Sequence, residues 1–373
     1  MINAPKVETQ PAGLKDPRLP GRMPCIDGWR AVSIIMVLGF HSQEMVGFSN
    51  TSRLSACSQF IFDGNLGVRF FFVISGFLIT YLLIREQERN DTVSLKSFYT
   101  RRALRILPVY TVYLVVVAAL QLTTQLHQAL VTWIGDLTFT TNFLRRGIIS
   151  AHLWSLSVEE QFYLIWPMTF IWLNKNKKFA LGIAASPIVV SMLCHIVTYS
   201  GHVPWIVHPL FHFQSSFVNF DSLDVGCMTA FLLARYGDKV ADFLSGNRRL
   251  AAITFGLVLI TIPKLQLAFL SPVWAITGNL LQAIGFAILL LTSILHPGCF
   301  KPLTWPIFVQ LGVVSYSIYI WQEIFYAGPK TYGFSSAWWM SVPWWLLPAV
   351  SLGFVSYYGL ERPLLKLRTR FRV

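Results

Sequence analysis

Charged side chains are scarce in this chain of 373 residues. Asp, Glu, Lys and Arg together make up 13% of it, whereas a soluble globular protein carries about 25%. The scarcity excludes disorder, a collagen or coiled-coil rod and an ordinary soluble enzyme, because so few charges cannot cover a water-exposed surface of this size. Apolar residues instead make up 54%, and the mean hydropathy is +0.54. Their long continuous runs predict an all-α, polytopic transmembrane helical bundle.

Cysteine motifs are absent as well. The five cysteines are scattered without a Cys-x-x-Cys pair, and most lie in or beside apolar runs, so we expect free thiols rather than disulfides or a metal site. We therefore predict no metal and no bound cofactor. Internal repeats, low-complexity tracts and a second folded domain are not found either, which leaves the spanning segments as the main organisation of the chain.

We expect ten spans, because a helix needs about 20 apolar residues to cross the hydrocarbon layer. The weakly apolar stretch 128–144 leaves two alternatives open, an interfacial helix or an eleventh span. The ten spans lie at roughly 27–47, 60–84, 106–124, 154–173, 180–198, 221–235, 250–263, 274–295, 306–327 and 339–360.

Basic residues outnumber acidic ones, with 30 Lys and Arg against 17 Asp and Glu and a formal net charge of +13. Such an excess can attract nucleic acid. With the N-terminus placed inside and ten spans, however, most Lys and Arg fall in the inner segments, as in membrane proteins whose cytoplasmic loops are basic. We predict both termini to be cytoplasmic and no nucleic-acid partner. Residues 1–24 form a flexible N-terminal tail, 25–367 the transmembrane domain and 368–373 a basic tail.

The first predicted span carries an acid, a guanidinium and an imidazole on one stripe. Arg30 and His41 are eleven residues apart, which is about three helical turns and about 16 Å along the axis. Asp27 lies about one turn before Arg30 on the same side. Ionisable groups inside a span are costly and mark functional sites by default. The alternative stays open that Asp27 caps the helix, Arg30 snorkels and His41 lies at the interface.

Two adjacent carboxylates, Glu159 and Glu160, open another apolar span. Acidic residues near a helix N-terminus can be explained by capping and by the helix dipole. That explanation accounts less well for two acids followed directly by apolar sequence. Neighbouring helix residues point about 100° apart, so both carboxylates cannot face one pocket equally. We expect one of them to be functional and the other structural.

Arginines gather before and inside two further spans. Arg101, Arg102 and Arg105 precede an apolar run, and Arg102 and Arg105 share a helix face. They are either topological anchors or a phosphate clamp, since guanidinium forks bind phosphate in a bidentate manner. Arg69 lies inside a span near its outer end, where snorkelling is the simpler explanation.

These residues resemble the acyltransferase-3 family of integral membrane acyltransferases, which includes bacterial O-acetyltransferases of O-antigen and exopolysaccharide. The resemblance runs in order from about residue 25 to 367. Two positions depart from it: Asn219 stands where many members have Arg, and Gln322 where many have His. The motifs that carry the resemblance are the Arg30-x10-His41 pair and the runs 71–80, 101–108, 154–163, 315–319 and 361–364.

The resemblance implies transfer of an acyl group, most often acetyl, from cytoplasmic acyl-CoA to a hydroxyl of a glycan or lipid-linked acceptor in the bacterial inner membrane. Acyl-CoA is then a co-substrate. His41 would act as the general base or as the acylated nucleophile. Glu159 or Glu160 would orient the imidazole, Asp27 would support the site, and Arg69 or Tyr163 would stabilise the oxyanion. The phosphates of CoA would be bound by Arg30, Arg101, Arg102 and Arg105.

Two other interpretations stay open at this point. Intramembrane Arg, His and Glu are also expected along the substrate path of a transporter or flippase for a glycolipid or polysaccharide. Such transporters often have internal repeats, and none is found here. A second family of membrane-bound O-acyltransferases also combines acyl-CoA with an intramembrane histidine, but its motifs stand in a different order. Dependence on acyl-CoA separates the transporter from both enzyme interpretations.

Overall fold

The computed structural model describes residues 23–47, 53–144, 147–175, 180–201, 208–212, 214–265 and 271–367. Over these ranges the backbone forms helices joined by turns and contains no β-strand. The all-helical prediction is therefore confirmed for the described part of the chain. The predicted tails 1–24 and 368–373 lie outside the described residues, except for positions 23 and 24.

Nine of the ten predicted spans coincide, apart from a few terminal residues, with an α-helix. The tenth, 339–360, is broken by the turn residues 341–345. Three helices extend well beyond the predicted bounds: α3 ends at Asn90, α4 begins at Leu95, and α9 covers Ser216–Phe243. The α-helices are α1 Pro24–Val46, α2 Arg53–Ile61, α3 Gly64–Asn90, α4 Leu95–Thr123, α5 Leu130–Thr138, α6 Leu153–Lys175, α7 Ala180–Ser200, α8 His208–Phe211, α9 Ser216–Phe243, α10 Asn247–Thr261, α11 Ser271–Leu295, α12 Pro306–Tyr326, α13 Leu346–Ser356 and α14 Arg362–Leu367.

Four helical segments are long and apolar enough to cross a membrane: Cys57–Asn90, which contains α3, and the helices α4, α9 and α11. A fifth is α12 together with the 3-10 segment before it, which are bent by 69°. Helices α1 and α6 have 23 residues each, a length of about 35 Å, but they carry the ionisable residues discussed above. An integral membrane protein is thus supported, while the count of ten spans and the side of each terminus stay predictions.

The weakly apolar stretch before α6 is not an eleventh span. Its only helix, α5, has nine residues and is about 14 Å long, less than half of a hydrocarbon core of about 30 Å. Buried Asp136 on α5 accepts hydrogen bonds from Gln128 Nε2 at 2.7 Å and Thr141 Oγ1 at 3.0 Å. The helix is therefore held by its own connecting loops, and its backbone also accepts a bond from Tyr110 of α4.

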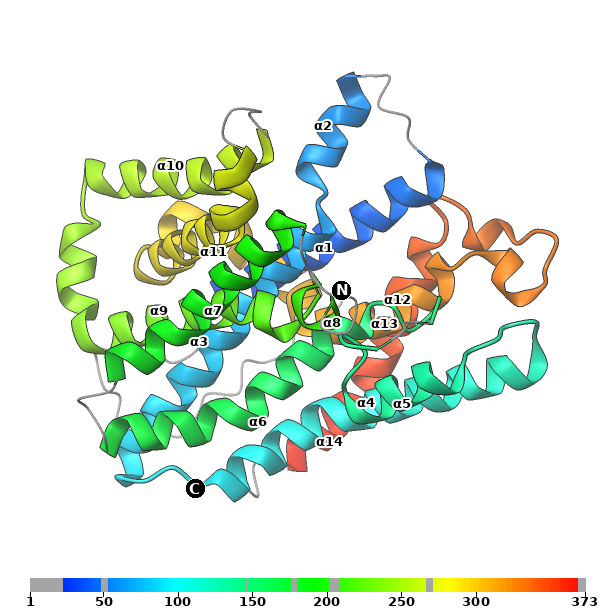
Figure 1. The fold of residues 1–373 in the computed structure, drawn as a ribbon, viewed down its shortest axis with the longest axis horizontal. Helices are drawn as coiled ribbons and strands as arrows, with labels where there is room; N and C mark the ends of the chain where they lie inside the picture. The colour runs from blue at the N-terminus through cyan, green and yellow to red at the C-terminus, as the bar shows by residue number, and fades with distance from the viewer. Residues whose placement is uncertain are drawn as a thin grey trace, which may run out of the picture.

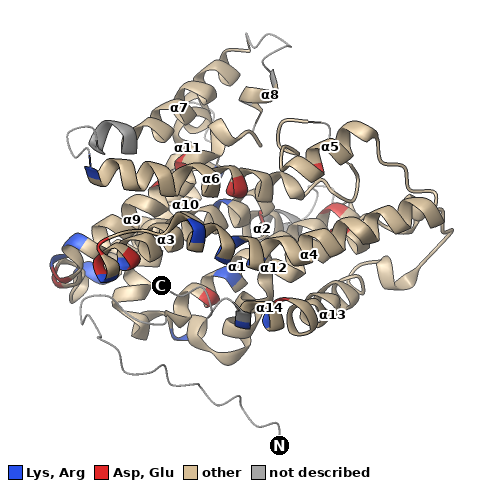
Figure 2. Cartoon of the chain, turned by 90° about the horizontal axis from the view of Figure 1, so that it is seen from below, with Lys and Arg blue, Asp and Glu red and all other residues tan. Residues whose placement is uncertain are grey.

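Helix α1 lies between two groups of helices. Figure 1 shows α7, α9, α10 and α11 gathered on one side and α4, α5 and α14 on the other. Helix α1 packs directly against α3 and α12, and α3 packs against α9. Most of the ribbon in Figure 2 is free of charge, and the few charged residues include a basic group near the middle of the molecule. The structure thus places α1, with its unusual polar residues, at the centre.

The backbones of α1 and α12 touch. A Cβ atom added at Gly312 of α12 would lie 1.7 Å from the carbonyl oxygen of Asp27, and one added at Gly28 would lie 2.1 Å from the carbonyl oxygen of Leu303. Only glycine permits this approach, because any side chain would overlap the facing backbone. The contact fixes how far α12 lies from α1, and with it the position of every polar residue that the two helices carry.

We predict that Gly312→Ala lowers the thermal stability of the purified protein, because the added methyl group must push the two helices apart. Overpacking costs about 1–3 kcal/mol in well-packed cores. Gly298→Ala is the matched control, since a Cβ there meets no described heavy atom within 4 Å. Thermal unfolding in detergent micelles, followed by tryptophan fluorescence, measures both variants. An unchanged midpoint for Gly312→Ala would contradict the close contact.

Candidate active site

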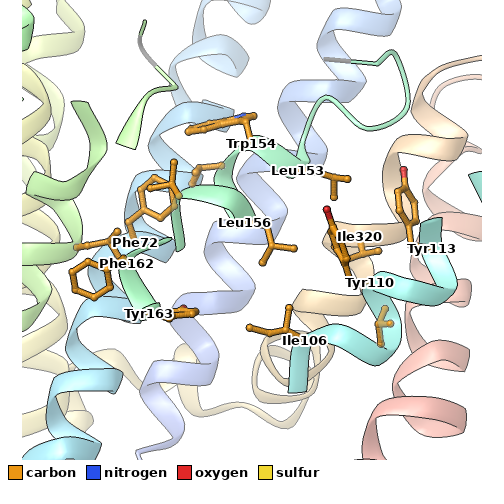
Figure 3. Packing of buried hydrophobic residues seen from close by; sticks show 14 of the residues in the cluster. Phe72, Ile106, Tyr110, Tyr113, Leu153, Trp154, Leu156, Phe162, Tyr163 and Ile320 are labelled. Carbon is orange, nitrogen blue, oxygen red and sulfur yellow. The ribbon is translucent and has the colours of Figure 1, made fainter. Parts of the chain in front are cut away.

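A pocket at the centre of the bundle gathers polar residues from five helices. Figure 3 labels three of its apolar lining residues, Phe72, Ile106 and Leu156, together with Tyr163. The polar lining consists of Arg30 of α1, Ser75 of α3, Arg102 and Arg105 of α4, Ser155, Glu159 and Tyr163 of α6, and Ser315, Tyr316 and Tyr319 of α12. The pocket therefore brings together residues that the sequence distributes over almost 300 positions.

Three guanidinium groups and one carboxylate line this pocket. Arg102 lies with its guanidinium carbon 4.3 Å from the centroid of the Tyr163 ring, a geometry in which the face of the ring attracts the cation. Arg105 follows on the same face of α4, and Arg30 approaches from α1. Because cations outnumber anions along the lining, the pocket is electrostatically suited to an anion.

Glu159 is the carboxylate of this pocket. It accepts a hydrogen bond of 2.6 Å from Ser75 Oγ, which fixes the rotation of α6 against α3. It also interacts electrostatically with Arg102 and Arg30. The adjacent Glu160 is not among the lining residues, and its Oε1 is buried without a hydrogen-bond partner among the described residues. The two neighbouring carboxylates thus have different surroundings, as their angular separation predicts.

A second carboxylate supports the arginines from outside the lining. Glu361, near the end of the chain, is 3% exposed and accepts a hydrogen bond from Ser317 of α12. It lies close enough to Arg105 and Arg30 to interact with both electrostatically. Glu361 belongs to a family-like motif, 361–364, but its role could not be predicted because nothing in the local sequence indicates which distant cation it faces.

Three other predicted site residues lie elsewhere. Arg101 forms an ion pair of 2.6 Å with Glu86 of α3. Arg69 donates to Gln282 of α11, a helix that contributes no residue to the pocket lining. Asp27 takes part in the α1–α12 contact through its backbone carbonyl. None of the three lines the pocket, so any part they play in binding acts through neighbouring residues.

His41 lies further along α1, beyond the pocket lining. Its Nδ1 is 3.2 Å from Oε1 of Gln322 on α12, and its ring stacks on Tyr326 with centroids 4.3 Å apart. An amide oxygen only accepts, so Nδ1 carries the proton and Nε2 keeps a free lone pair. Gln322, which departs from the family pattern, is therefore the residue that sets the tautomer of His41.

Tyr319 connects the pocket with the surroundings of His41. Its ring lines the pocket, its hydroxyl contacts Ser155 Oγ at 2.7 Å, and it donates to the carbonyl oxygen of His152 at 2.9 Å. On α12 it lies one turn before Gln322. Sequence reasoning missed Tyr319, Tyr316 and Ser75 as lining residues, although each lies in a family-like motif, because hydroxyl-bearing residues are common in membrane helices.

Among the described residues no group of three or more His, Cys, Asp or Glu side chains could hold a metal ion. The pocket lining supplies three guanidiniums suited to anionic groups and one fixed carboxylate, and an imidazole with a free lone pair lies beyond the pocket.

A model of the acyltransferase-3 family, described as an acyltransferase domain, matches residues 23–359. The chain is similar to the peptidoglycan O-acetyltransferase OatA of Listeria monocytogenes, with 29% identity over 329 residues, covering 80% of this chain and 49% of that protein. It is also similar to the O-acetyltransferase OatA of Staphylococcus aureus, with 27% identity over 325 residues, covering 81% of this chain and 50% of that protein.

The chain spans about half the length of these curated relatives. No solved structure gave a match. The family comparison favours the enzyme interpretation over the transporter. Several described helices are long and apolar enough to cross a membrane, which supports an integral membrane protein. Because the family model covers most of the chain, this protein belongs to the acyltransferase-3 family.

Proposed function

We propose that this protein transfers an acetyl group from cytoplasmic acetyl-CoA to a hydroxyl group of a carbohydrate acceptor. The observation that carries the proposal is the central pocket, in which Arg30, Arg102 and Arg105 face a single lining carboxylate, Glu159. The relatives named as O-acetyltransferases support the nature of the group that is transferred and of the atom that receives it.

The pocket lining suits two parts of a CoA thioester, its phosphates and its pantetheine arm. CoA carries several phosphates, and guanidinium groups bind phosphate through charge-assisted hydrogen bonds. The apolar part of the lining, which includes Phe71, Ile74 and Leu78 of α3, accommodates the long and mostly uncharged pantetheine arm. We expect Arg102 and Arg105 to hold the phosphates and the arm to extend along α1 toward His41.

His41 acts as the general base in this proposal. Its Nε2 lone pair accepts the proton of the acceptor hydroxyl as the oxygen attacks the thioester carbonyl. The C–O bond forms, the C–S bond breaks, and the departing thiolate of CoA takes the proton back from the imidazolium. Gln322 holds Nδ1–H throughout, which is the orienting role that a carboxylate has in catalytic triads. Glu159 then serves to position Arg102 and Arg30.

The direction of transfer follows from the proposed topology. With ten spans and both termini in the cytoplasm, Arg102 and Arg105 lie near the cytoplasmic end of α4, and His41 lies toward the opposite side. Acetyl-CoA would enter from the cytoplasm and the acceptor from outside. We propose the plasma membrane of a bacterium as the location, in keeping with the origin of the relatives.

We predict that Arg102→Ala raises the KM for acetyl-CoA at least tenfold and changes kcat less, because the guanidinium binds a part of the donor that does not react. Arg89→Ala, which removes the same charge from the exposed end of α3, is the matched control and keeps the wild-type KM. Initial rates of CoA release at varied acetyl-CoA concentration measure both. An unchanged KM for Arg102→Ala would contradict binding of acetyl-CoA by Arg102 and would leave it as a topological anchor.

We predict that His41→Ala lowers acetyl transfer by about 10²–10⁴-fold, the usual contribution of a general base, while the affinity for acetyl-CoA stays near that of the wild type. The exposed His127 supplies the control variant His127→Ala. Isothermal titration gives the affinity, and transfer of a labelled acetyl group gives the rate. Full activity of His41→Ala would remove His41 from the mechanism.

A further inference from the structure

The central pocket is elongated, and its two ends have different chemistry. Its lining on α6 extends from Ser155 to Tyr163, which is about 12 Å along the helix axis. Figure 3 shows α6 running along this length, from Trp154 through Leu156 to Tyr163. Arg102 lies over the Tyr163 ring, 4.3 Å from its centroid. One end of the pocket is therefore cationic, and we call it the arginine end.

The opposite end is formed by α3, α6 and α12. Helices α3 and α6 run in the same direction. Phe72 lies against Trp154 with ring centroids 6.1 Å apart, and further along both helices Thr80 accepts a hydrogen bond of 2.8 Å from Trp166. The first lining residues of α3 and of α6 thus lie at the same end, where α12 contributes Tyr319. We call this the aromatic end, and its lining residues, all uncharged, are Val68, Phe71, Phe72, Ser155 and Tyr319.

Two aromatic rings narrow the pocket at the aromatic end. Phe71 and Tyr319 face one another with ring centroids 6.5 Å apart and ring planes at 60°. Phe71 is half-buried, whereas Phe70 and Phe72 on either side of it are 0% and 1% exposed. The accessible part of the Phe71 ring belongs to the pocket lining. A group that extends from the arginine end toward the aromatic end therefore meets these two rings.

Tyr319 is held in place by hydrogen bonds to the start of α6. Its hydroxyl donates to the carbonyl oxygen of His152 at 2.9 Å, so it accepts from Ser155 Oγ at 2.7 Å. The ring also lies against the imidazole of His152, with centroids 5.3 Å apart. Because movement of the ring would break both hydrogen bonds, Tyr319 forms a fixed wall opposite Phe71.

The aromatic end lies next to His41. Tyr319, Gln322 and Tyr326 follow one another at intervals of three and four residues, which places them on one face of α12. Gln322 is hydrogen-bonded to His41, and Tyr326 stacks on the imidazole. Gln322 lies about 4.5 Å beyond Tyr319 along the helix axis. A CoA thioester with its phosphates at the arginine end therefore has its acyl group beside the two rings, about one helical turn from the partner of His41.

We propose that Phe71 and Tyr319 restrict the donor to a short acyl chain. The inference rests on the proposed function and adds to it the residues that determine which acyl group is used. An acetyl group ends in the space beside the two rings. A longer chain would overlap the Phe71 ring or fill the space in front of His41, where the acceptor hydroxyl must approach. Apolar sites of this kind discriminate by about 10–200-fold for each methylene group.

Phe71→Ala in the full-length protein tests the proposal, because it opens space beside the acyl group. The measured quantity is kcat/KM for hexanoyl-CoA divided by kcat/KM for acetyl-CoA, from initial rates of CoA release in membrane vesicles that retain the glycans of the producing cell. We expect the wild type to prefer acetyl-CoA and Phe71→Ala to raise the hexanoyl-to-acetyl ratio at least about tenfold, the scale of one methylene group. The ratio does not depend on the amount of folded protein.

Leu78→Ala is the matched control. Leu78 lines the same pocket and is half-buried on the same face of α3 as Phe71, but it lies about 10 Å closer to the arginine end. Its truncation enlarges the pocket away from the acyl group, so we expect the wild-type hexanoyl-to-acetyl ratio even where both rates fall. A rise as large as that in Phe71→Ala would show a general loosening of the pocket and would overturn the proposal.

Two milder variants keep the test decisive where Phe71→Ala does not fold. Phe71→Leu keeps an apolar side chain of smaller size, and we expect a hexanoyl-to-acetyl ratio between those of the wild type and Phe71→Ala. Tyr319→Phe keeps the ring but removes its two hydrogen bonds to the start of α6. We expect the freed ring to raise the ratio while the affinity for acetyl-CoA, set at the arginine end, stays near that of the wild type.

The outcomes separate the two proposals. A folded wild type that turns over no acyl-CoA overturns the proposed function itself. A wild type that uses hexanoyl-CoA as efficiently as acetyl-CoA overturns only the selection at the aromatic end. An unchanged ratio in Phe71→Leu overturns the role of Phe71, and an unchanged ratio in Tyr319→Phe overturns that of Tyr319.

Discussion

The direct contact between the backbones of α1 and α12 is the constraint on which the site depends. Gly312 lets the carbonyl oxygen of Asp27 approach to a distance that no side chain would permit. Helix α1 carries Arg30 and His41, and α12 carries Tyr316, Tyr319 and Gln322. Because the contact fixes the spacing and register of these two helices, it determines both the arginine pocket and the hydrogen bond between His41 and Gln322.

The burial of charged side chains inside an apolar bundle is the second feature that determines the properties of the site. Burying a guanidinium is costly unless it is paired or meets a ligand. The protein pairs its three pocket arginines only in part, through Glu159 held by Ser75 and Glu361 held by Ser317. The remaining positive charge makes the pocket suited to an anionic ligand, which in the proposed function is the phosphates of the CoA donor.

Much of the architecture could be predicted from the sequence, because long apolar runs determine helices through local composition. Nine of the ten predicted segments coincide with an α-helix, the tenth is broken at residues 341–345, and Arg30, Arg102, Arg105 and Glu159 meet in one pocket. The eleventh-span alternative failed because composition alone does not reveal that α5 ends after nine residues. The buried residues of this short helix are Thr132, Gly135 and Asp136, whereas its apolar Leu130, Ile134 and Leu137 are exposed.

The contacts between the site residues could not be predicted from the sequence. The choice between Glu159 and Glu160 depends on the rotation of α6 about its axis, which is set by its packing against Ser75 of α3. His41 and Gln322 are 281 positions apart, and no local pattern relates them. Gln322 was noticed only as a departure from a family pattern.

The central claim is that a cytoplasmic acetyl-CoA bound at the arginine pocket gives its acetyl group to a carbohydrate hydroxyl beyond His41. Inside-out vesicles containing the protein, supplied with acetyl-CoA labelled in the acetyl group, test it most directly. The account predicts that CoA is released on the outer side of these vesicles while the label appears in glycan enclosed within them. Folded protein that binds and consumes no acetyl-CoA, with glycan acceptors present, would contradict it.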